Sequence, residues 1–114
     1  MRIATSMVLA GALLVSGCSR GVPIAISNQS GSALENLVAS GTGFSMAVGE
    51  LAPGVIREVR VAPKGEGGLR LTFAVSGKAF DTGNVGYFEG NGYCVAATIA
   101  PTFVLGVKSK LQPC

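Results

Sequence analysis

The chain has 114 residues, which allows one domain, and 48% of them are hydrophobic while only 13% are charged. So little charge excludes a disordered chain, and the formal net charge of +3, spread over dispersed basic residues, is too mild for a nucleic-acid-binding domain. The chain contains no histidine, which excludes His-based catalysis and the common His-ligated metal sites.

Residues 1–17 have the layout of a secretory signal peptide. Arg2 gives a positive start, residues 3–15 carry no charge, and small residues follow. The uncharged run is shorter than the roughly 20 residues that a transmembrane helix needs. The alternative is a buried N-terminal helix, which Gly11 and Gly17 would weaken. We therefore predict that residues 1–17 are removed on export.

The end of this segment, Val15-Ser16-Gly17-Cys18, resembles the lipobox of bacterial lipoproteins. The resemblance implies cleavage between Gly17 and Cys18, diacylglycerol on the Cys18 sulfur and, in most such proteins, a further acyl chain such as palmitate on the new amino group. Several acyl chains give lasting membrane attachment, since each buried CH₂ contributes about 0.8 kcal/mol. Ser19 stands where an aspartate would favour the inner membrane, so the resemblance favours the periplasmic face of an outer membrane.

The domain itself is expected to span residues 22–114, after a short tether of residues 18–21. Alternating apolar and polar side chains predict a strand over residues 22–27, and Asn28-Gln29-Ser30-Gly31 predicts a turn. Apolar runs at residues 34–39 and 44–51 follow, separated by a turn at residues 40–43. Pro53-Gly54 fits the centre of a type II turn.

The second half of the chain continues the pattern. Alternation predicts strands over residues 56–61 and 69–75, with a loop at residues 63–68 between them. A short strand at residues 78–82 and a loop at residues 83–92 come next. The last strands are predicted at residues 93–99 and 103–107, with Lys108 and Lys110 flanking the final one, as at a protected sheet edge.

These seven or eight strands, with turn signals every eight to twelve residues and no amphipathic helix, predict an all-β fold, a small antiparallel β-sandwich or barrel. "ISNQSGSALENLVASG" and "GELAPGVIREVRV" resemble immunoglobulin-like modules of bacterial surface proteins, which favours the sandwich. That resemblance implies no particular activity.

Cys94 and Cys114 remain after the predicted cleavage and are expected to form a disulfide, because an exported domain with an even number of cysteines meets an oxidising compartment. The alternative is two unrelated thiols. A bridge of this length would stabilise the fold by roughly 3 kcal/mol.

Residues 84–93 hold both tyrosines, Tyr87 and Tyr93, beside Phe88. One interpretation is a partner-binding loop, because tyrosine is enriched at interface centres. The other is that Tyr87 or Phe88 folds back to plug one end of the sandwich, with Asn91-Gly92 as a hairpin turn.

No cofactor motif, calcium loop or nucleophile elbow is present in the sequence, and none of the six carboxylates forms a close pair in sequence. The first functional hypothesis is therefore a non-enzymatic, membrane-anchored lipoprotein whose domain binds another envelope component, such as an envelope protein. The second is a small-ligand or inhibitor module with residues 84–93 over an apolar pocket. An enzyme ranks last, since it would need a carboxylate pair assembled by folding.

Overall fold

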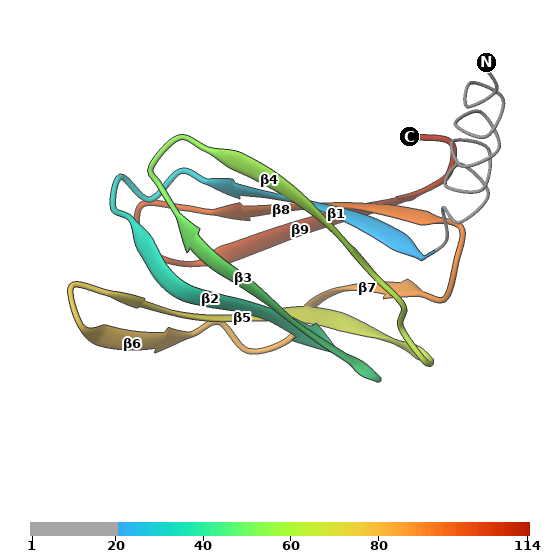
Figure 1. Ribbon diagram of the computed structural model, residues 1–114. Helices are drawn as coiled ribbons and strands as arrows, with labels where there is room; N and C mark the ends of the chain where they lie inside the picture. Colours follow the sequence, from blue (N-terminus) through green and yellow to red (C-terminus); the bar gives the residue numbers. More distant parts are fainter. Residues whose placement is uncertain (1–20) are drawn as a thin grey trace, which may run out of the picture.

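The computed structural model describes residues 21–114 (Figure 1). The predicted signal peptide, the cleavage site at Gly17 and the lipid attachment site at Cys18 lie outside the described residues. Nine strands occur in the described part: β1 (Val22–Asn28), β2 (Leu34–Gly41), β3 (Phe44–Leu51), β4 (Ile56–Val61), β5 (Glu66–Val75), β6 (Lys78–Asp81), β7 (Val85–Glu89), β8 (Tyr93–Ile99) and β9 (Leu105–Leu111). In residues 21–114 there is no helix with the length and hydropathy that a membrane crossing requires.

The strands form two sheets that pack face to face, as predicted for a small β-sandwich (Figure 1). Sheet A has four strands in the order β4-β1-β8-β9. Sheet B has five strands, with the order β3-β2-β5-β6 and β7 paired to the first part of β5. Both sheets, the core cluster and the disulfide are formed by residues within the described part, 21–114.

The core follows directly from the alternation of side chains along the strands. In β1, Val22, Ile24 and Ile26 are fully buried while Pro23 and Ala25 face outward. The same alternation operates in β5 and β8, where the buried residues are Leu69, Leu71, Phe73, Val95, Ala97 and Ile99. Each buried aliphatic side chain contributes roughly 1.5–3 kcal/mol, so this layer supplies most of the stabilisation.

Some details differ from the predicted architecture. The described residues form nine strands where seven or eight were expected. The pairing is mainly antiparallel, as predicted, and β1 runs parallel to β8. The predicted loop at residues 63–68 ends early, since β5 begins at Glu66 and pairs there with β7. The last strand is β9 (Leu105–Leu111), so Lys108 and Lys110 lie within it.

Phe103, predicted to lie in the last strand, belongs instead to the β8–β9 connection. Its φ of 63° is unusual for a residue with a side chain. The conformation turns its ring onto an aromatic cluster, with centroids 4.7 Å from Phe80 and 6.2 Å from Phe73. Aromatic pairs at such separations stabilise by about 0.5–1.5 kcal/mol each, which offsets the backbone strain.

Asn28 ends β1 and is the polar side chain of the described part that is fully buried. Its Nδ2 donates to the Ser32 carbonyl at 2.7 Å and to the Leu51 carbonyl at 2.9 Å. Its Oδ1 accepts from the backbone N–H of Ser30 at 3.0 Å and from the Ser30 hydroxyl at 2.7 Å. The side chain therefore ties the β1–β2 turn to the end of β3.

Two features at the edges match the sequence predictions. Gly54 has a φ of 79° and Val55 N–H donates to the Ala52 carbonyl at 3.2 Å, which is the predicted type II turn. Cys94 and Cys114 form a disulfide across 20 positions of sequence. Cys94 lies on β8 opposite Lys110, so the bridge holds the segment after β9 against the outer face of sheet A.

Candidate functional site

The segment at residues 84–93 is not the loop that the sequence suggested. Residues Val85–Glu89 form β7, and Phe88 is 1% exposed and packs against Phe44 in the core. The interpretation of Phe88 as a ring presented to a partner is therefore wrong. The alternative, a ring folded back into the sandwich, describes Phe88, which belongs to the core cluster.

The two tyrosines of this segment have different environments. Tyr93 is partly buried against the core, whereas Tyr87 is 47% exposed. Asn91-Gly92 does not make a hairpin, because β7 and β8 belong to different sheets. Asn91 instead accepts a hydrogen bond from Gly21 N–H at 2.9 Å, which fixes the start of β1.

Folding brings together one carboxylate pair that the sequence did not reveal. Glu66 on β5 and Glu89 on β7 are directly opposite in register, and Tyr87 Oη donates to Glu89 Oε2 at 3.1 Å. That hydrogen bond, with desolvation and the nearby Glu66, raises the pKa of Tyr87 to about 12. All three side chains are exposed, so the group behaves as a solvated hydrogen-bonded cluster.

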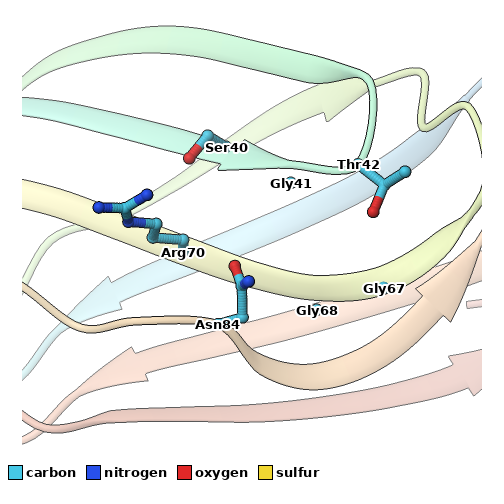
Figure 2. Close-up of a pocket in the computed structure, with 7 residues that line it drawn as sticks. All are labelled: Ser40, Gly41, Thr42, Gly67, Gly68, Arg70 and Asn84. Carbon is cyan, nitrogen blue, oxygen red and sulfur yellow. The ribbon is translucent and has the colours of Figure 1, made fainter.

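A more defined depression lies on the outer face of sheet B (Figure 2). Its volume is about 270 Å³. The polar side chains of Ser40, Thr42, Arg70 and Asn84 surround a floor made by glycine backbone; with Gly41, Gly67 and Gly68 they form what we call the Arg70 groove. Arg70 and Asn84 also line an adjoining shallow hollow with Asp81, Thr82 and Gly83.

The groove arises where β5 changes partners. β5 pairs with β7 at its start and with β6 at its end, and residues 82–84 cross the gap between them. Thr82 closes the gap, because its hydroxyl accepts from Leu71 N–H at 2.9 Å and its own N–H donates to the Leu71 carbonyl at 3.0 Å. The backbone at this point is thereby satisfied although no strand is continuous there.

The glycines of the groove are required by close packing and do not form a phosphate-binding loop. A Cβ on Gly68 would lie 2.7 Å from the Val85 carbonyl oxygen, and one on Gly67 would lie 2.5 Å from the Thr42 hydroxyl oxygen. Both distances are too short for a side chain, so these positions permit β7 and the β2–β3 hairpin to approach β5. The result is a floor without side chains.

Arg70 is the charged residue of the groove, and it pairs with Asp81 in the adjoining hollow. Arg70 Nε donates to Asp81 Oδ1 at 2.9 Å, Arg70 Nη2 also donates to Asp81 Oδ2, and Gly83 N–H donates to Asp81 Oδ1 at 2.9 Å. The hydrogen bond from Arg70, with that from Gly83, lowers the pKa of Asp81 to about 2. The same pairing raises the pKa of Arg70. The pair is therefore fixed in its charged form at neutral pH.

The chemistry available in the Arg70 groove is recognition by hydrogen bonds. Arg70 has further N–H donors beyond those it gives to Asp81, and Ser40, Thr42 and Asn84 offer both donors and acceptors. Within residues 21–114 no group of three or more Cys, Asp or Glu side chains is arranged to hold a metal ion. From the sequence, the groove residues are expected in turns, loops or strands, at residues 40–43, 63–68, 69–75 and 83–92, and none of them is assigned a function.

No protein-family model matches the sequence, and the search of curated proteins found no match. Among solved structures, the chain is similar to an NMR structure of a protein from Eubacterium rectale, with a TM-score of 0.57 and 15% sequence identity. The similarity covers 84% of this chain and 93% of that chain. At this identity the comparison shows the all-β fold.

Proposed function

We propose that the protein is a lipoprotein of a bacterial cell envelope, attached by lipid on Cys18 at the periplasmic face of the outer membrane. In this proposal the β-sandwich is a non-catalytic module that binds another envelope component through the Arg70 groove. The supporting observation is the groove itself, where Arg70 is held by its hydrogen bonds to Asp81 in the adjoining hollow and the other polar groups are neutral donors and acceptors.

The geometry of the groove favours binding over catalysis. A general acid or base needs a pKa near the working pH, and Arg70 holds the pKa of Asp81 at about 2. Ser40 and Thr42 have no imidazole partner, because the chain has no histidine. A rigid set of polar groups over a backbone floor suits a polar partner such as a glycan or the polar surface of a protein.

The start of the domain supports a short anchor. Gly21 is buried, its N–H is bound to Asn91, and a Cβ at this position would lie 2.5 Å from the Val61 carbonyl oxygen. Ser19 and Arg20 alone separate it from Cys18, so the tether spans at most about 10 Å when extended. A lipid on Cys18 would thus hold the domain against the headgroups.

Photo-crosslinking in intact cells tests the binding role. Crosslinking amino acids at Thr42 and at Asn84, on opposite sides of the groove, should capture the same envelope component. The matched control is Gln29, which is exposed at the opposite end of the sandwich. Capture from Gln29 alone, or no capture from either groove position, would contradict the proposed role of the groove.

A further inference from the structure

The outer face of sheet A carries a second surface feature that the proposed function leaves unused. Two depressions, of about 290 Å³ and about 370 Å³, share Cys94 and Val95 in their linings, and Cys114 also lines the smaller one. We call them together the sheet A trough. Its floor is apolar and formed by small side chains, of which Pro23, Ala25 and Ala96 are the central ones.

The trough follows from the registers of sheet A. The central strands β1 and β8 place Ala25 opposite Ala96 on the outer face, while the edge strands carry long side chains. On β4, Arg60 is opposite Pro23 and Glu58 is opposite Ala25. On β9, Lys110 is opposite Cys94 and Lys108 is opposite Ala96.

The charges that border the trough are mostly of one sign. Arg60 stands on one side, Lys108 and Lys110 stand on the other, and Glu58 is the acidic group of this face. All four side chains are exposed and none of them appears in the ion pair of the described part. An apolar floor of small side chains between mostly cationic borders is complementary to the anionic headgroups and upper acyl region of a phospholipid bilayer.

We infer that the outer face of sheet A is a membrane-docking surface for anionic phospholipids, so that the domain lies on the bilayer with sheet A down and the Arg70 groove facing away. The close approach to the bilayer rests on the proposed anchor at Cys18. Pro23 and Cys94 lie at the Gly21 end of sheet A, so a short tether from Gly21 holds the trough at a high effective concentration of lipid. Weak contacts are then enough to set the orientation.

The two sheets offer a built-in comparison for the test. Lys78 lies on β6 of sheet B, far from the trough, and serves as an internal reference for Lys108 and Lys110. Ala96 on β8 and Ala47 on β3 are both exposed alanines, on sheet A and sheet B respectively. Ala96→Glu and Ala47→Glu therefore change the net charge equally but alter opposite sheets.

The experiment uses the chain from residue 18 onward, with Cys18 coupled chemically to a maleimide phospholipid in vesicles. Because Cys94 and Cys114 are bonded, Cys18 provides the reactive thiol. This artificial anchor makes the result independent of whether cells lipidate Cys18. Lysine acetylation rates are measured by mass spectrometry on phosphatidylcholine vesicles with and without phosphatidylglycerol.

On anionic vesicles, acetylation of Lys108 and Lys110 should be slowed by about tenfold relative to Lys78, since each cation near such a surface contributes about a fivefold preference. The protection should weaken at high salt and on vesicles of phosphatidylcholine alone. Ala96→Glu should abolish it and Ala47→Glu should retain it, with both variants melting as the parent chain does.

Equal acetylation of all three lysines on anionic vesicles would overturn the inference, as would stronger protection of Lys78. Protection of Lys108 and Lys110 that appears only after envelope proteins are added would make sheet A a protein interface and would equally overturn it. Failure of Cys18 to carry lipid in cells would instead count against the proposed anchor.

Discussion

Replacing Asn28 by alanine tests how strongly this side chain holds the β1–β2 turn against the end of β3. The side chain makes four hydrogen bonds, two as donor to the Ser32 and Leu51 carbonyls and two as acceptor from Ser30. The turn at Ser30 and Ser32 is partly exposed, so those groups regain water when the amide is lost. The Leu51 carbonyl bond is buried and has no such replacement.

These contacts set the expected size of the effect. An unpaired buried carbonyl costs about 1–3 kcal/mol, and each of the partly buried bonds contributes about 0.5 kcal/mol or more. Asn28→Ala should therefore lower the free energy of unfolding by about 3 kcal/mol. For a domain of this size that lowers the Tm by roughly 12–24 °C.

The measurement is urea unfolding followed by circular dichroism on the chain from residue 18 with Cys18→Ser. The matched control is Gln29→Ala, whose exposed side chain makes only a 3.4 Å contact with the Ser27 hydroxyl and should change stability by less than about 0.5 kcal/mol. A loss below about 1 kcal/mol for Asn28→Ala would show that the buried Leu51 carbonyl does not depend on this amide.

Three further predictions concern stability. Phe88→Ala should lower the free energy of unfolding by about 3–5 kcal/mol, because the ring is buried between the sheets. Tyr87→Ala, at an exposed ring, should lower it much less. Chemical unfolding compares the two variants, and similar losses would contradict the burial of Phe88. Replacing both Cys94 and Cys114 by alanine should lower the free energy of unfolding by roughly 3 kcal/mol, because the disulfide is lost. Thermal melts with and without reductant measure the effect. An unchanged melting temperature would contradict a stabilising role for the disulfide. Arg70 lowers the pKa of Asp81 in the folded protein to about 2, so the stabilisation by the Arg70–Asp81 pair is present above pH about 4 and is lost as the pH falls toward 2. Asp81→Asn should therefore make the free energy of unfolding less dependent on pH between about 4 and 2. Equal acid sensitivity of the variant and the parent chain would contradict a stabilising pair.

The sequence was a good guide to the elements whose signals are local. The alternation in β1, β5 and β8 predicted which side chains are buried, and Pro53-Gly54 predicted its turn type. The pairing of Cys94 with Cys114 followed from the count of cysteines and the expected compartment. In each case the residues concerned lie close together in sequence or have few alternatives.

Features that depend on distant pairing were missed. The parallel pairing of β1 with β8 joins two segments that are far apart in the sequence, and no local sequence pattern encodes it. β7 was hidden by Gly86 and its neighbouring glycines, which resemble a loop, although Gly86 is required because a Cβ there would lie 2.5 Å from the Val107 side chain. The partnership of Arg70 with Asp81 was open to prediction, since Ser76 and Gly77, at φ 49° and 82°, make a two-residue hairpin turn that sets the register of β5 and β6.

Metabolic labelling with an alkyne fatty acid, followed by the intact mass of the purified protein, tests the proposed anchor most directly. The parent chain should incorporate the label, start at residue 18 and carry the mass of a diacylglyceryl group, and Cys18→Ala should incorporate none. A protein that keeps residues 1–17, or that starts at residue 18 with a free thiol and no label, would contradict the proposed anchor.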